Sequence, residues 1–381
     1  MNAIRSKQEI EDLAWGCTFM GTGGGGNPKD GIAWLSAALE EGNEISWINH
    51  TEIADDVWTV CPFLMGSTAP LTDEAKQEMK RLGLGKTDYK GVQEESVRLL
   101  EDHMGIKVGA VVAFELGGSN TLGLVATAAR LGIPAVDGDY AGRAVPEICQ
   151  STPCVGDLPL WPLSSLDPYG NSAVIREAIS YEMAERMGRF LSVASFGNLA
   201  MAGFPLKGRD MQRVIVPGTL SKCLEIGRLI RVSNETGHDP VKEIVNELDG
   251  WLLFEGKVTD REWEDKGGYC YGTHTLQGLD RFKGLELKIW FKNENHISWL
   301  DGKPYVTSPD MLIVVDRETG KPLVNAEGPT AQKADAIEKG QHVAVIGLRA
   351  VEQFRSQKGL DVLGPGHFGF SIPYTPIENL V

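Results

Sequence analysis

The spacing of apolar residues predicts that the chain begins with a helix. Over residues 7–20 the apolar side chains recur at intervals of three and four, which places them on one helical face. Ser6 precedes this run and Glu9 follows three residues later, as in an N-terminal capping box. A glycine run at 21–26 ends the helix, and a second helix is expected from about residue 29 to residue 41.

The next part of the chain alternates between strand and helix patterns. Strands are expected at 44–48 and 57–66, and helices at 73–82 and 92–104. Residues 107–115 form a nearly continuous apolar run, which is typical of a strand buried on both faces of a parallel sheet. A helix of small residues over 121–131 and a short strand over 133–136 follow. This strand–helix–strand order predicts an open α/β layer structure.

The pattern changes in the second half. Helices are expected at 177–190, 219–232 and 240–248, and short strands at 251–258, 266–274, 285–291, 296–299, 303–307, 311–315 and 342–347. Short strands separated by turn signals are typical of a β-barrel or sandwich. We therefore expect an α/β plus β protein. Residues 1–165 would form a three-layer α/β domain. Residues 166–381 would form a domain with helices and then a β-barrel, and the end of the chain would pack back on the site.

Composition narrows the class of protein. A length of 381 residues fits two domains, and a net charge of −15 disfavours binding to nucleic acid or to anionic membranes. The six cysteines are scattered, so neither a disulfide framework nor a structural zinc site is indicated. The polar N-terminus and the lack of a long apolar stretch predict a cytoplasmic protein without a membrane span. A homo-oligomer is expected on general grounds.

The glycine run contains the candidate binding residues Gly23, Gly24 and Gly25. Four consecutive glycines lose much backbone entropy when they become ordered, so a physical reason is needed for them. Their amides could approach a ligand closely, or the run could simply form a tight turn between two helices. The run matches neither a Walker A motif nor a dinucleotide fingerprint, because no Gly-Lys-Ser/Thr follows and a helix precedes it.

Carboxylates end or follow two of the expected strands. Glu115 ends the buried apolar run, and Asp137 and Asp139 follow the next strand. Ligands of open α/β sheets bind beyond the carboxyl ends of the strands, so these groups are candidates for acid–base catalysis or for a divalent metal such as zinc, manganese or magnesium. Arg143 could clamp a substrate carboxylate or orient the acids. The structural alternative is helix capping and an Asp–Arg network.

Histidines give weaker signals. Cys270 and His274 would share one face of a strand and could bind zinc, although a structural histidine is the simpler interpretation. His367 lies in a constrained Gly-Pro-Gly-His-Phe-Gly segment and could close over a site. Motifs of the zincins and of serine hydrolases are absent from the sequence.

Several motifs spread along the chain share one family pattern. They are Gly21-Thr22-Gly23-Gly24-Gly25, Phe114-Glu115-Leu116-Gly117-Gly118-Ser119-Asn120, Asp137-Gly138-Asp139, Gly142-Arg143-Ala144-x-Pro146-Glu147, Gly218-Thr219-Leu220-Ser221, Ile226-Gly227-Arg228, Lys292-Asn293-Glu294, Ser308-Pro309-Asp310 and Gly364-Pro365-x-His367-Phe368-Gly369. In them the chain resembles the S-methyl thiohydantoin desulfurase-like family. The resemblance implies an α/β domain and a domain with a β-barrel. It also implies hydrolysis of a hydantoin-like cyclic urea or thiourea, with release of sulfide or a thiol.

The resemblance brings no established catalytic residues, so the roles are expected from residue chemistry. Asp137 or Asp139 would act as base or metal ligand, and Glu115 as acid or base. Asn120 and the amides of Gly23, Gly24 and Gly25 would donate hydrogen bonds to ring carbonyls, while Glu147 and His367 would complete the substrate site. His274 is a further candidate metal ligand.

Two alternatives to this hydrolase stay open. In the first, the protein is an ATP-assisted hydantoinase-type enzyme or its subunit, and the glycine run holds phosphates. In the second, it is a non-catalytic partner in a hydantoin pathway.

Overall fold

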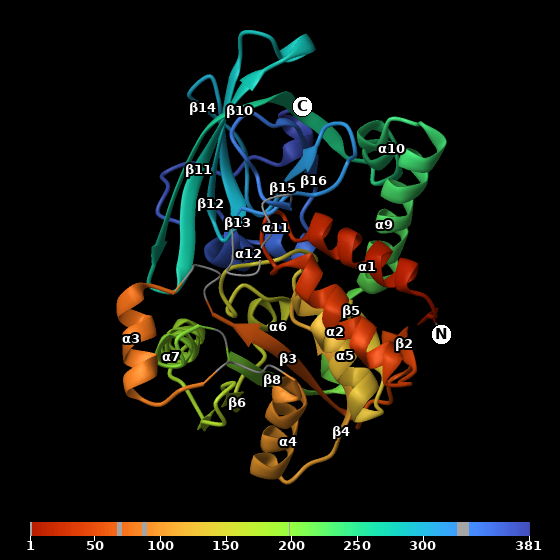
Figure 1. Cartoon of the computed structure of the whole chain (residues 1–381), viewed down its shortest axis with the longest axis vertical. Helices are drawn as coiled ribbons and strands as arrows, with labels where there is room; N and C mark the ends of the chain where they lie inside the picture. Colours follow the sequence, from red (N-terminus) through yellow and green to blue (C-terminus); the bar gives the residue numbers. More distant parts are fainter. Residues whose placement is uncertain (1, 67–70, 86–89, 198, 326–334) are drawn as a thin grey trace.

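The computed structural model describes residues 2–66, 71–85, 90–197, 199–325 and 335–381 (Figure 1). The strands are β1 (Asn2–Ile4), β2 (Ile45–Asn49), β3 (Trp58–Met65), β4 (Val108–Ala113), β5 (Ala135–Asp139), β6 (Leu163–Leu166), β7 (Ser172–Ile175), β8 (Leu199–Lys207), β9 (Val216–Pro217), β10 (Trp251–Lys266), β11 (Tyr269–Gly278), β12 (Glu286–Lys292), β13 (Glu294–Leu300), β14 (Lys303–Thr307), β15 (Met311–Asp316) and β16 (His342–Leu348).

Most of the helices lie around the first of two sheets. The helices are α1 (Lys7–Met20), α2 (Pro28–Glu40), α3 (Asp73–Arg81), α4 (Val92–Met104), α5 (Asn120–Leu131), α6 (Thr152–Val155), α7 (Tyr181–Ala194), α8 (Gly208–Val214), α9 (Thr219–Thr236), α10 (Pro240–Glu247), α11 (Glu352–Arg355) and α12 (Gln357–Leu363). Helix α10 instead packs on α9 and on β10 of the second sheet. The bounds of α1 and α4 agree with the sequence prediction, and the Ser6 side chain caps α1 as expected. In the described residues, none of these helices is both long enough and apolar enough to cross a membrane.

The first sheet is mixed and lies below the second in Figure 1. Its order is β1-β2-β5-β4-β3-β8-β6-β7, with β9 beside β5, and the neighbours from β2 to β3 are parallel. Successive residues of β4 alternate between two hydrophobic cores. Val111 and Ala113 enter one core with α1, α2 and α5, whereas Val112 and Phe114 enter the other on the opposite face. Helices therefore cover both faces, as the predicted layers require.

Strand β8 was not predicted from the sequence. It pairs antiparallel with β3 and β6, and all but its last residue are buried. Its sequence, Leu-Ala-Met-Ala-Gly-Phe-Pro-Leu-Lys, contains small residues, a glycine and a proline, which weaken a local strand signal. The first sheet thus draws strands from both sides of residue 165.

A second correction concerns the end of β5. The sequence pattern placed Asp137 and Asp139 in a loop after the strand, but both lie within β5. The two residues of β9 pair antiparallel with Gly138 and Asp139 and extend the strand. Local periodicity could not indicate this pairing, because β9 comes from a distant part of the sequence.

The second sheet is antiparallel and curled, in the order β14-β13-β12-β11-β10-β16-β15. Within the described residues, the edge strands β14 and β15 are not hydrogen-bonded to each other, so this sheet is a curled half-barrel. This agrees with the predicted β-barrel in part, since closure into a full barrel is not confirmed. A long hairpin joins β10 and β11 through Gly267 and Gly268, which both have positive φ angles.

Candidate functional site

The candidate site lies where the carboxyl ends of the parallel strands meet the second sheet. The glycine run is joined to that sheet by backbone hydrogen bonds. Asn295 donates to the Thr22 carbonyl over 2.9 Å, and Asn325 donates to the Gly23 carbonyl over 2.8 Å. Residues distant in the sequence are thereby fixed against each other at this edge.

The protein's own atoms fill the space beside the glycines. A Cβ on Gly24 would lie 1.8 Å from Oε1 of Glu294, and one on Gly25 would lie 2.5 Å from the Cα of Gly117. A Cβ on Gly23 would lie 2.4 Å from the Asn325 side chain. Close packing by itself therefore requires glycine here, whether or not a ligand also approaches.

Glu115 follows β4 and is 5% exposed. One carboxylate oxygen accepts a hydrogen bond of 2.6 Å from the Asn120 side chain, and the other accepts one of 2.7 Å from the Val145 amide. Burial raises the pKa of Glu115 to about 7, although these hydrogen bonds oppose the shift. Asn120 thus holds this carboxyl group in place, and Glu115 can exchange a proton near neutral pH.

Glu294, at the start of β13, is a second buried carboxyl group at this place. It is 2% exposed, and one of its oxygens, Oε2, has no hydrogen-bond partner among the described residues. Burial, followed by the nearby charge of Glu115, raises its pKa well above the usual value. The sequence pattern did not predict Glu294 as a site residue. Its place in the motif Lys292-Asn293-Glu294 was the available signal.

The two aspartates of β5 face the start of α9. Asp137 accepts hydrogen bonds from the Ser221 amide (3.0 Å) and the Ser221 hydroxyl (2.5 Å). Asp139 is fully buried, and one of its oxygens accepts from the amides of Ala141 and Gly142. Burial raises the pKa of Asp139 to about 7. Asp137 therefore serves as an anchor for α9, while Asp139 holds the turn that leads to Arg143.

The candidate metal ligands do not gather in the part of the chain that the structure describes. No three or more His, Cys, Asp or Glu side chains there are arranged to hold a metal ion. His274 instead lies 3.0 Å from Oδ1 of Asn325 and stacks on Phe291, and burial lowers its pKa to about 3. Asp137, Asp139, Glu115 and His274 therefore form no such group, and we derive no step through a metal.

Arg143 joins the two halves of the molecule. It is 2% exposed and donates to the Thr22 hydroxyl (2.9 Å) and to the carbonyls of Asn295 (3.0 Å) and Pro309 (3.1 Å). Burial lowers its pKa to about 10, although the carboxyl groups nearby, Glu294 first, oppose the shift. Its donors are directed at oxygen atoms of the protein, so Arg143 acts as a clamp.

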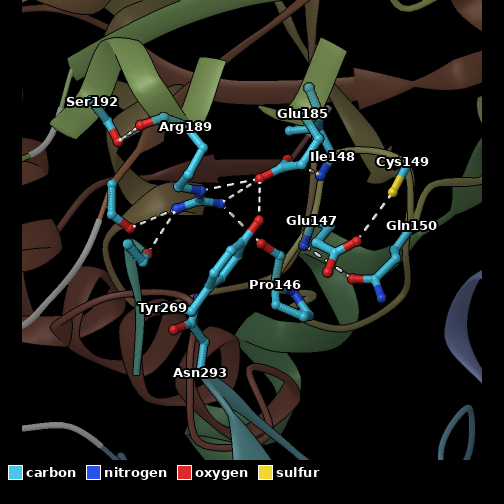
Figure 2. Close-up of polar contacts among 12 residues, drawn as sticks. Pro146, Glu147, Ile148, Cys149, Gln150, Glu185, Arg189, Ser192, Tyr269 and Asn293 are labelled. Carbon is cyan, nitrogen blue, oxygen red and sulfur yellow. Dashed lines mark hydrogen bonds and ion pairs between the residues drawn. The ribbon is translucent and has the colours of Figure 1, made fainter. Parts of the chain in front are cut away.

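A polar network holds the loop that positions Glu115 (Figure 2). Arg189 of α7 pairs with Glu185 and donates to the Pro146 carbonyl, and Glu185 accepts from the Ile148 amide over 2.8 Å. Figure 2 shows the Tyr269 hydroxyl directed at Glu185, over 2.5 Å. Because Val145 directly precedes this loop segment, the network helps to fix the amide that contacts Glu115.

Glu147 connects this loop to the end of the chain. Its carboxylate pairs with Lys292 of β12 and lies 3.0 Å from Nε2 of His367. Burial would raise the pKa of Glu147, but His367 and Lys292 together lower it to about 2. The structure thus brings the two sequence candidates Glu147 and His367 together, and adds Lys292.

The sequence did not indicate His296, on the hairpin of β12 and β13, as a site residue. It lies at a register shift between β12 and β13. Ile297 pairs with Trp290 and Asn295 pairs with the next residue, Phe291, so His296 between them has no paired residue on β12. Its Nδ1 lies 2.7 Å from the Ser308 hydroxyl, which itself accepts a hydrogen bond from Arg143. Because the Ser308 hydroxyl accepts from Arg143, its own proton is available for Nδ1 of His296. An accepting Nδ1 leaves the ring proton of the neutral histidine on Nε2.

The Nε2 atom of His296 is buried. The Lys292 carbonyl lies nearby, but Nε2 makes no well-formed hydrogen bond to any described residue. Burial, and then the charges of Arg143 and Lys292, lower the pKa of His296 well below its ordinary value. The ring is therefore neutral, with an unused donor.

Comparisons with known proteins cover nearly the whole chain. A family model described as "S-Me-THD-like, N-terminal domain" matches residues 8–177, and one described as "S-Me-THD-like, C-terminal domain" matches residues 179–377. A crystal structure of a protein from Chromobacterium violaceum has a TM-score of 0.77 at 21% identity, covering 99% of this chain and 100% of that chain. At that identity the likeness concerns the fold. Among curated proteins none matches.

Proposed function

The chain belongs to the S-Me-THD-like family, and on this premise we propose that it hydrolyses a thiohydantoin, releasing a thiol or sulfide. The observation that carries the proposal is the pair of buried, interacting carboxyl groups Glu115 and Glu294, the second of which lies against Gly24 of the glycine run. Interacting carboxyl groups with raised pKa values are suited to acid–base work near neutral pH.

The proposed reaction uses S-methyl thiohydantoin and one water molecule. Glu115, as carboxylate, takes a proton from the water while the water oxygen bonds to ring carbon C2. Glu294, as carboxylic acid, gives its proton to the adjacent ring nitrogen. In the second step the C2–S bond breaks, the sulfur takes the proton from Glu115, and the new hydroxyl returns a proton to Glu294. The products are hydantoin and methanethiol, and both carboxyl groups are restored.

The environment of each carboxyl group supports this division of roles. Glu115 has a pKa near 7 and accepts hydrogen bonds from two donors, the Asn120 side chain and the Val145 amide. A substantial fraction of the Glu115 side chains is therefore ionised at neutral pH. Glu294 has the more strongly raised pKa and an oxygen without a partner, which fits a protonated group that donates to a substrate.

The test is a thiol-release assay with S-methyl thiohydantoin at pH 7. We expect turnover by the native protein and a loss of about 100-fold or more in Glu115→Gln and in Glu294→Gln. Glu264→Gln, which changes an exposed residue of β10, is the matched control and should keep full activity. No thiol release by the native protein, or full activity in both site variants, would refute the proposal.

A further inference from the structure

A cavity of about 260 Å³ lies beside β3 of the first sheet, among the helices α2, α4 and α5. Side chains from α2, β3, the α4 region and α5 line it, and none of them belongs to the candidate site. Its walls combine an indole ring, a buried amide and a set of paired charges, supplied by Trp34, Gln93, Glu94 and Arg130.

A glycine keeps this cavity open. A Cβ on Gly123 of α5 would lie 2.9 Å from Oε1 of Gln93 and 3.3 Å from the ring of Trp34. Both contacts are tighter than an ordinary van der Waals contact, so a larger residue would displace the side chains. The bare helix surface at Gly123 thus allows the amide and the indole to reach the same place.

The side-chain amide nitrogen of Gln93 has no hydrogen-bond acceptor among the described residues. The residue is 8% exposed, and its Nε2 makes no hydrogen bond to the described part of the chain. A buried donor left without an acceptor is unfavourable, because it has given up its hydrogen bonds to water. An acceptor atom of a ligand in the cavity would remove this cost.

The charged side chains that line the cavity in the described part of the chain balance one another. Arg130 pairs with Glu41 over 2.9 Å and with Glu94 over 3.5 Å, and Lys90 pairs with Glu41 over 3.1 Å. Among these described side chains two acids therefore face two bases, and a charged ligand would leave an uncompensated charge. Trp34 is half-buried and supplies a flat apolar wall, which suits a planar ring.

From these features we propose that the cavity binds a neutral planar heterocycle that carries a ring carbonyl beside a ring N–H. The carbonyl accepts from Nε2 of Gln93, the N–H donates to Glu94, and the ring lies against Trp34. Cyclic amides and imides, including hydantoins and pyrimidine bases, share this chemistry. This site is separate from the proposed reaction, because Glu115 and Glu294 take no part in it.

The experiment is a fluorescence titration of the full-length Glu115→Gln/Glu294→Gln protein with hydantoin and with uracil. We expect saturable quenching that Trp34→Phe lacks. Gln93→Leu should weaken binding about tenfold, which corresponds to one lost neutral hydrogen bond. Ala37→Phe should abolish binding by filling the cavity, because Ala37 lines it. Gln357→Leu, in α12, is the matched control and should bind like its parent.

The outcomes separate this site from the reaction. Ala37→Phe in the otherwise native chain should keep its thiol-release activity and its melting temperature. The proposal would be overturned if neither probe gave saturable quenching. It would also be overturned if Gln93→Leu and Ala37→Phe both bound the probes with the affinity of their parent. Preference for hydantoin or for uracil would identify the ring.

Discussion

At the scale of single residues, burial of carboxyl groups dominates the chemistry. Asp139 and Glu115 both have pKa values raised to about 7, so the folded protein holds protons that the unfolded chain has released. The stabilisation that these two groups contribute is fully present below about pH 4. It decreases as the pH rises from about 4 to 7 and is lost above the folded pKa. Glu147, with a pKa lowered to about 2, acts in the opposite sense at acidic pH.

The variant Asp139→Asn tests whether deprotonation of Asp139 makes the native protein less stable as the pH rises. The amide keeps an oxygen for the amides of Ala141 and Gly142 but carries no charge. Relative to the native protein, the variant should gain about 2–3 kcal/mol between pH 5 and pH 8. Thermal melts of the variant and the native protein at pH 5 and pH 8 measure this difference in stability, with Asp102→Asn as an exposed control. A variant whose relative stability does not change with pH would contradict the raised pKa.

The ring of His296 offers a second test. It should stay neutral at pH 6 and carry its proton on Nε2, because Ser308 occupies Nδ1. Nitrogen-15 NMR of labelled histidine reports the tautomer, and His296→Gln identifies the signal. Ser308→Ala should allow the other tautomer. A charged ring at pH 6, or a proton on Nδ1, would show that the assignment is wrong.

At the scale of elements, the glycine run is a packing feature. Gly25 has a φ of +74° and contacts Gly117, whereas Gly42 has a φ of +85° with open space around it. Gly42→Ala should cost about 1 kcal/mol, since only the backbone conformation is strained. Gly25→Ala should cost several kcal/mol more, because an atom must also be accommodated. Urea denaturation measures both, and equal costs would exclude the packing explanation.

The sequence predicted those elements whose signal is local. The capped helix α1 and the buried strand β4 follow from spacing and composition alone. Strand β8 and the extension of β5 depend on pairing with distant strands, which no local pattern records. The same reason explains the site. Glu115 was predicted from its position after β4, whereas Glu294 becomes a candidate only when β13 is placed against the glycine run.

At the scale of the whole molecule, Arg143 links the loop after β5 to the second sheet. Arg143→Met should lower stability by about 3–5 kcal/mol, because several buried oxygen atoms lose their donor. Arg143→Lys should recover part of this loss. Calorimetry measures the change, and Arg349→Met, at a half-exposed position, is the control. A melting temperature like that of the control would argue against a clamp.

The position of β8 has a consequence for synthesis on the ribosome. The segment matched by the N-terminal family model ends at residue 177, before β8 has been made. A nascent chain of that length lacks the strand that lies between β3 and β6, and it also lacks Glu294. Its first sheet is interrupted and its proposed acid pair is incomplete. The protein would therefore stay catalytically silent during translation and gain activity only when the later half has emerged and folded.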